Sequence, residues 1–186
     1  MKGPARLLQR AASPRSFALW LLAYALYFPL FFYGDVPFGL KRIAPYAKEG
    51  GILDTEFFYT AAEAYARLEQ FGAEGRRVYH AILMGDLFYP VLLGGVLAVA
   101  LTLLFRALRL RGRFWPYAGL VPLAMTVCDY TENLLVLTLL RHYPEPLTAA
   151  ATAAGFATAA KFLFGGASFA LLGLGLLLWL LRIRKN

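Results

Sequence analysis

The chain has 186 residues, of which 60% are hydrophobic and 16% aromatic, and it carries a formal net charge of +8 and one cysteine. A soluble domain of this length would hold more charge and shorter apolar runs, and a single cysteine excludes both an intramolecular disulfide and paired-cysteine redox chemistry. Because a bilayer core of about 30 Å needs roughly 20 apolar residues per helical crossing, the composition predicts a helical integral membrane protein.

Four apolar segments approach or exceed the length of a crossing. We therefore expect an all-α bundle of four transmembrane helices in a single membrane domain. The expected spans are residues 16–34, 78–105, 115–140 and 149–181, with a loop at 35–77, all within one domain at 1–186. The first span lacks a small-residue cleavage site, so it is expected to be a permanent helix and not a removed signal peptide.

The loop at 35–77 is expected to lie over the mouth of the bundle as a partly helical lid. It is too short and too rich in glycine and proline to form a core of its own. Its apolar residues also exceed what a solvated loop tolerates. Thr60 and Glu63 have the spacing of a capping box, and Gly72 is placed to end the helix that they begin.

Basic residues flank the expected spans unevenly. The stretches 2–15, 106–113 and 182–185 hold eleven basic residues and no acid, whereas the opposite side mixes basic and acidic residues. The positive-inside rule then predicts that both termini are cytoplasmic, in a multi-pass protein of a bacterial-type inner or plasma membrane. Since these basic residues flank spans and no recognition motif accompanies them, no nucleic-acid partner is expected.

The last expected span overshoots a bilayer, because 33 residues form about 50 Å of helix. Its first third, at 149–160, is therefore expected to project beside the lid. Small residues along this span would allow a neighbouring helix to approach closely, which leaves a homodimer open.

Polar residues from three spans are expected at one depth. Counted along each helix from the basic residues at its cytoplasmic end, Asp86, Glu132, Asn133 and Lys161 lie between 19 and 21 residues away, with Asp129 about one turn deeper. The three polar residues of the third span share one helix face, which should point into the bundle because lipid cannot solvate it. Lys161 is the only basic residue inside a span, so we expect it to pair with Glu132 or Asp129.

Further residues are expected to join this polar site. Pro90 has no N–H for the carbonyl of Asp86, so that carbonyl and the Asp86 carboxylate should both be available near one point. Tyr79 lies about two turns before Asp86 on the same face, and Tyr130 and His80 are expected near the same level. The expected ligand-binding set is Asp86, Asp129, Glu132, Asn133, Lys161, Tyr130, Tyr79 and His80.

Three acids against one lysine leave a surplus of negative charge, which favours a site for a ligand, a proton or an ion. The first hypothesis is a binding module that takes a lipid-like, isoprenoid or other amphipathic molecule in an outward-facing cavity, with the acids meeting its polar end. A membrane lipid or a hydrophobic small molecule is then the expected partner. The alternatives are proton- or cation-coupled transport, a purely structural tetraspan subunit, and an enzyme with Asp129 or Glu132 as acid or base.

Two features resemble the EXPERA-type membrane proteins, which are the sterol isomerases and relatives of the sigma-2 receptor. They are spans that flank a long outer loop and an acid followed by a proline in the second span, here Asp86 and Pro90. The resemblance implies isomerase-type acid/base chemistry on a lipid or sterol-like substrate. It extends to no longer motif, and no catalytic residue is assigned from it.

Signatures of soluble enzymes and of metal sites are absent from the sequence. The two histidines, His80 and His142, belong to the ends of different spans, and there is neither an H-E-x-x-H motif nor a phosphate loop. We therefore expect no metal and no cofactor. The inner halves of the spans lack polar residues, so a pore through one copy of the chain would have no lining.

Overall fold

The fold is all-helical, and four of its helices are long and apolar enough to cross a membrane. A computed structural model describes residues 3–47, 51–110 and 112–183, and contains no strand within them. The elements are α1 (Pro4–Ala11), α2 (Pro14–Tyr33), η1 (Leu40–Ile43), η2 (Leu53–Thr55), α3 (Ala61–Asp86), α4 (Tyr89–Leu108), η3 (Trp115–Leu120), α5 (Val121–His142) and α6 (Thr148–Ile183). The helical class predicted from the sequence is confirmed.

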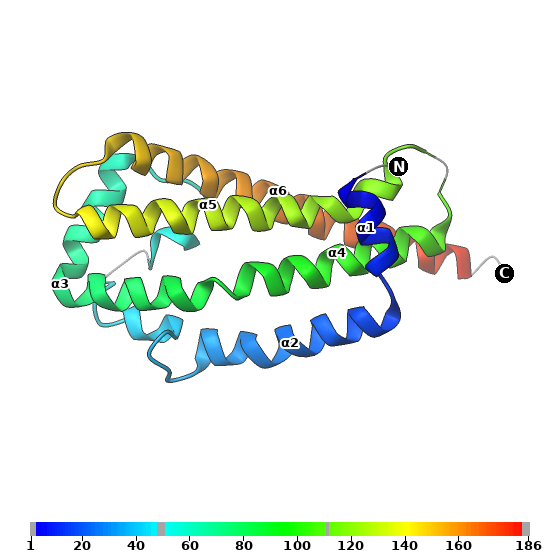
Figure 1. Ribbon diagram of the computed structural model, residues 1–186, viewed down its shortest axis with the longest axis horizontal. Coiled ribbons are helices and arrows are strands. Elements are labelled where there is room, and N and C mark those ends of the chain that lie inside the picture. Colours follow the sequence, from blue (N-terminus) through cyan, green and yellow to red (C-terminus); the bar gives the residue numbers. More distant parts are fainter. Residues whose placement is uncertain (1–2, 48–50, 111, 184–186) are drawn as a thin grey trace.

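The long helices run side by side, and α1 lies at the same end of the bundle as the last turns of α6 (Figure 1). We call the end that carries α1 and the last turns of α6 the terminal end, and the opposite end, where α3 begins, the lid end. At the terminal end, Arg106 donates hydrogen bonds to the carbonyls of Gln9 and Ala12, at 3.3 and 3.2 Å, which ties α1 to α4. Among the basic residues of the three flanking stretches, Lys2, Arg111, Arg184 and Lys185 lie outside the described residues.

The helix of the lid begins as the sequence predicts. The Thr60 hydroxyl accepts a hydrogen bond from the Glu63 N–H at 3.3 Å, and the Glu63 carboxylate accepts one from the Thr60 N–H at 2.7 Å. At Gly72 the backbone has φ 63 and ψ −176, a conformation that side-chain-bearing residues rarely adopt. The helix that begins after Thr60 therefore ends at Gly72, as the sequence predicts, and a second helical stretch follows directly across this kink, so that the label α3 covers both.

Loss of this cap should be measurable. Replacing Thr60 with alanine is expected to lower the free energy of unfolding by about 1 kcal/mol, because the Glu63 N–H and the Glu63 carboxylate both lose a partner. Thermal unfolding in detergent, followed by circular dichroism, would measure the loss. The control is Thr131→Ala, since the Thr131 hydroxyl is exposed and, within the part of the chain that the structure describes, bonds only the Val127 carbonyl of its own helix. Equal effects of the two substitutions would contradict the assignment of Thr60 as the cap.

The second span differs from the single helix expected over 78–105. This span consists of two helices, because α3 ends at Asp86 and α4 begins at Tyr89. Pro90 occupies the first turn of α4. Proline has no N–H, and the N–H groups in the first turn of a helix have no partner within the helix. Proline therefore favours the start of a new helix at this position over a kink within one continuous helix.

Hydroxyl groups from neighbouring helices bond the backbone carbonyls around this interruption. Tyr27 of α2 donates to the Gly85 carbonyl at 2.6 Å, and Tyr130 of α5 donates to the Leu87 carbonyl at 2.7 Å. Buried carbonyls without a partner would cost free energy. These hydroxyls therefore stabilise the break that positions Asp86 at the end of α3.

The segment before α3 packs onto the bundle with its apolar side chains. Ile52, Leu53 and Tyr59 are all at most 4% exposed. Along α6, a side chain at Gly155 would overlap the Tyr59 carbonyl, so this helix approaches the segment at backbone distance. The first third of α6 thus lies beside the lid. The whole helix has 36 residues and is about 54 Å long.

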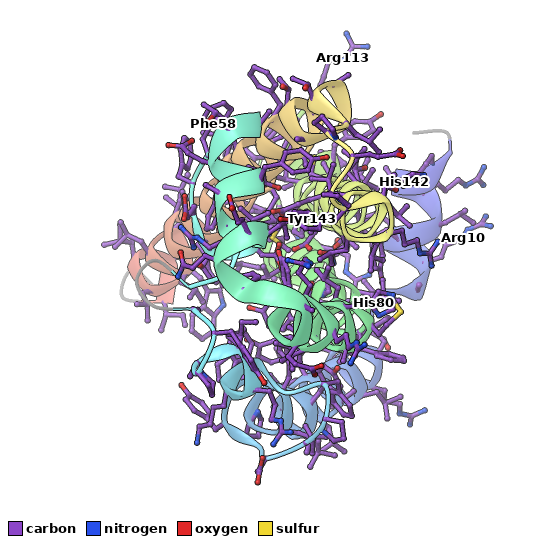
Figure 2. The ribbon with its side chains drawn as sticks, turned by 90° about the vertical axis from the view of Figure 1, so that its left-hand side faces the viewer. Arg10, Phe58, His80, Arg113, His142 and Tyr143 are labelled. Carbon is purple, nitrogen blue, oxygen red and sulfur yellow. The ribbon has the colours of Figure 1, made fainter. Side chains whose placement is uncertain are left out.

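Two aromatic pairs also join the lid to α6. The ring centroids of Phe57 and Phe162 are 6.1 Å apart, and those of Phe58 and Phe156 are 5.4 Å apart. Figure 2, which looks onto the lid end, shows Phe58 at the edge of the bundle near the start of α6. The lid is therefore held along α6 by aromatic contacts next to the cavity described below.

Candidate functional site

A cavity of about 530 Å³ lies beneath the lid, between α2, α4, α5 and α6. Its apolar walls come from all four helices, and its polar groups come from the lid, α3, α5 and α6. The apolar side chains include Phe31, Phe32, Leu93, Met125, Phe162 and Phe169, and the charged ones are Asp54, Asp86, Asp129 and Lys161. Its volume falls within the range of about 300–1,000 Å³ that is usual for small-molecule sites.

The charged groups lie toward the lid end of the cavity. Met125 is one turn deeper than Asp129 on α5, while Gly165 and Phe169 are one and two turns deeper than Lys161 on α6. At about 5.4 Å per turn, the apolar part of the cavity extends some 5–11 Å beyond the charged groups. The site is therefore amphipathic along the bundle axis.

Lys161 contacts only one of the two acids considered as its partners. Its Nζ lies 2.5 Å from Oε2 of Glu132, and the two side chains are 11% and 0% exposed. Glu132 points into the helix interface and does not line the cavity, whereas Asp129 does. The ammonium group at the cavity wall is thus already matched by a carboxylate behind it.

Asn133 links the two remaining carboxylates of the spans. Its amide nitrogen donates to Oδ2 of Asp86 at 2.7 Å and lies 3.4 Å from Oδ1 of Asp129. Asn133 is fully buried, and the two aspartates are 9% and 7% exposed. One amide group therefore holds carboxylates from α3 and α5 side by side at the cavity wall.

A fourth acid, Asp54, comes from the lid and was missed by the sequence analysis. The Tyr79 hydroxyl donates to its Oδ1 at 3.0 Å; Tyr79 is fully buried, and Asp54 is half-buried next to the buried Leu53. The signal was present, since Asp54 stands between apolar residues in the loop at 35–77, which was expected to lie over the mouth of the bundle. Tyr79 thus positions a lid carboxylate instead of contacting Asp86.

Tyr59, also from the lid, lies next to Glu132. Burial raises the pKa of its hydroxyl, and the charge of Glu132 raises this pKa further. The phenol therefore stays neutral and can donate a hydrogen bond. The lid contributes a buried donor as well as an acid to this region.

Two members of the expected set lie elsewhere. Tyr130 is occupied with the Leu87 carbonyl, and His80 lines a separate groove on α3 and α5. Figure 2 shows His80 on the side of the bundle away from Phe58. Each follows directly after a residue of the cluster, Asp129 or Tyr79, and one helical position rotates a side chain by about 100°. Their depth could be counted along the chain, but their direction points away from the cavity.

Among the described residues, the assembled site contains four carboxyl groups and one ammonium. Within the part of the chain that the structure describes, no group of three or more His, Cys, Asp or Glu residues is arranged to hold a metal ion. The carboxylates that face the cavity, Asp54, Asp86 and Asp129, are hydrogen-bond acceptors when ionised. The arrangement can therefore receive a donor group or a positive charge at the end of an apolar chamber.

Comparison with known proteins gives no relative for this chain. No family model, no curated protein and no solved structure matches it. The likeness to EXPERA-type proteins stays confined to Asp86, Pro90 and the long loop, and what the site does is inferred from its own residues.

Proposed function

We propose that the protein is a multi-pass membrane protein that binds an amphipathic small molecule in the cavity beneath the lid. The polar end of this molecule is a cation or a hydrogen-bond donor, for which a primary amine is the simplest example. The observation that carries the proposal is the apolar cavity whose lid end presents Asp54, Asp86 and Asp129, while its one lysine is paired with Glu132.

The proposed topology has both termini in the cytoplasm of a bacterial-type cell. The described parts of the basic stretches, on α1 and at the ends of α4 and α6, lie at the terminal end, and the charge asymmetry of the sequence supports a cytoplasmic location of that end by the positive-inside rule. The lid end then faces the outside, and the ion pair of Lys161 with Glu132 lies within the outer half of the membrane.

The ligand is proposed to come from the membrane itself. Phe162 and Phe169 line the cavity and are 38% and 54% exposed on α6, so the cavity is bordered by a lipid-facing surface. A molecule dissolved in lipid gains little from apolar walls, because acyl chains are equally apolar. Selection must then depend on its polar end, where the carboxylates act in a medium of low dielectric constant and attract a cation strongly.

The test is native mass spectrometry of the protein with three ligands of one chain length, namely a primary amine, an alcohol and a carboxylate. The amine is expected to bind most tightly and the carboxylate least. The variant Asp129→Asn should weaken amine binding by about tenfold or more, because a charge-assisted hydrogen bond is lost. Alcohol binding should change less, since the amide oxygen of asparagine still accepts.

The control is Asp35→Asn, which removes a charge from the same end of the bundle. Asp35 is 90% exposed and, among the described residues, pairs only with Arg42, so amine binding should stay within about twofold of the unmodified protein. Equal affinity for the amine and the carboxylate, or an equal effect of the two asparagine variants, would reject the proposed site. Extraction of lipids from the purified protein would identify any molecule that remains bound.

A second candidate function is acid/base catalysis on the same ligand. It is favoured by two carboxyl groups, those of Asp86 and Asp129, that Asn133 holds next to each other at one cavity wall. Such a pair could donate and accept protons on a bound substrate. A panel of lipid and isoprenoid substrates that shows no turnover above an Asp129→Asn control would remove this candidate and leave the binding function in place.

A further inference from the structure

A second groove, of about 420 Å³, lies at the lid end and collects positive charge. It is lined by Ala73, Arg76, Arg77 and His80 from α3 and by Leu140 and Arg141 from α5. The four residues of α3 have the spacing of a single helix face. Three guanidinium groups and one imidazole therefore border one concave surface.

Arg76 is held in place within this groove. It donates a hydrogen bond to the Leu68 carbonyl at 2.9 Å, and its guanidinium carbon lies 3.9 Å from the ring centroid of Tyr143. A guanidinium has five N–H groups in a rigid fork, so these two contacts leave donors available. The side chain is positioned before any ligand arrives.

The positive charges of the groove are scarcely neutralised. Among the described residues, Arg76 and Arg141 have no carboxylate within 4 Å, and Arg77 pairs only with Glu74, at 2.7 Å. The side chains of Arg77 and Glu74 are 77% and 66% exposed, and such exposed pairs contribute little. An anion with several oxygens would relieve the repulsion among the arginines.

Membrane topology does not account for this cluster. Basic residues are favoured on the cytoplasmic side, yet Arg76, Arg77 and Arg141 are found at the lid end of the bundle, opposite to the described parts of the basic flanking stretches. Arg141 is next to the last residue of a candidate span, Trp115–His142, and Arg76 and Arg77 directly precede the apolar stretch that begins at residue 78, so the groove lies at the level expected for lipid headgroups. The planar fork of arginine matches a phosphate group in geometry and charge.

We propose that this groove binds a phosphate group, carried either by the headgroup of an anionic lipid or by a soluble phosphate ester. Arg76 is the fixed donor. Arg77 of α3 and Arg141 of α5 donate hydrogen bonds to the phosphate oxygens that Arg76 does not contact. The site is separate from the cavity beneath the lid and does not depend on the function proposed for that cavity.

The test compares the double variant Arg77→Gln/Arg141→Gln with the double variant Arg42→Gln/Lys41→Gln. The second pair removes the same charge from the same end of the bundle, and its residues do not line the groove. Native mass spectrometry with phosphatidylglycerol, and thermal shift with glycerol 3-phosphate, are the two readouts. The groove variant is expected to weaken binding of at least one probe by about tenfold or more, and the control by about twofold or less.

The two probes separate the two sources of phosphate. Binding of phosphatidylglycerol alone identifies a lipid headgroup site, and saturable stabilisation by glycerol 3-phosphate identifies a site for soluble phosphate esters. The variant Arg77→Lys/Arg141→Lys keeps the charge but loses the fork, so it should bind more weakly than the unmodified protein and more tightly than the glutamine variant. Absence of binding by both probes, or equal losses in the groove and control variants, would overturn the proposal.

Discussion

Replacing Lys161 with methionine is expected to lower the free energy of unfolding by about 3–5 kcal/mol, the usual cost of removing one partner of a buried ion pair. Glu132 is fully buried, and Lys161 is its ion-pair partner at 2.5 Å. Without the ammonium, Glu132 must either remain charged in an apolar interface or take up a proton on folding, and both outcomes oppose folding. Thermal and denaturant unfolding in detergent would measure the loss.

A second substitution should restore much of this stability. In the double variant Lys161→Met/Glu132→Gln no buried charge is left in the pair, so its stability is expected to lie well above that of Lys161→Met alone. Lys41→Met serves as the control, because Lys41 is exposed at the lid end, and it should change stability by less than about 0.5 kcal/mol. A double variant as unstable as Lys161→Met would show that the ion pair is not the reason for the loss.

Replacing Gly166 with phenylalanine is expected to weaken ligand binding strongly without unfolding the protein. Gly166 lines the cavity, and a Cβ atom added there would meet no atom within 4 Å, so the new ring can extend into the chamber. A helical glycine is also less favourable than most other residues, so stability should be unchanged or rise by a few tenths of a kcal/mol. Native mass spectrometry with the amine, together with a melting curve, would measure both effects.

The matched control for this substitution is Gly173→Phe. Gly173 lies two turns further along α6, is exposed, and likewise has no atom within 4 Å of an added Cβ, but it does not line the cavity. Amine binding should then be weakened by about tenfold or more at Gly166 and remain nearly unchanged at Gly173. Undiminished binding in a folded Gly166→Phe variant would place the ligand outside this cavity.

The apolar lengths and local periodicities of the sequence determined the helical class and much of the local structure. The spans expected at 16–34 and 149–181 correspond closely to α2 and α6, because about 20 apolar residues form a helix that can cross a bilayer. The lid helix was readable from Thr60 and Glu63, since a capping box depends only on residues three positions apart.

The spacing of the polar residues in α5 also predicted that they lie on one face of this helix. Asp129, Glu132 and Asn133 are spaced by three and four positions, and all three are buried in the bundle. Spacing within one helix fixes such a face without reference to any neighbour. It could not fix which of the two acids Lys161 would meet, because that depends on how α6 is rotated against α5.

Only the tertiary structure decided how the separate elements converge. The path of the lid brings Asp54 to the cavity, and the break between α3 and α4 ends α3 at Asp86. The rotation of α3 against α5 places His80 in the groove that Arg141 also lines. The helical repeat determines how far along a helix each residue lies and which residues share a face of that helix. The orientation of one helix against another, and the course of a loop, follow from side-chain packing between segments that are distant in the sequence.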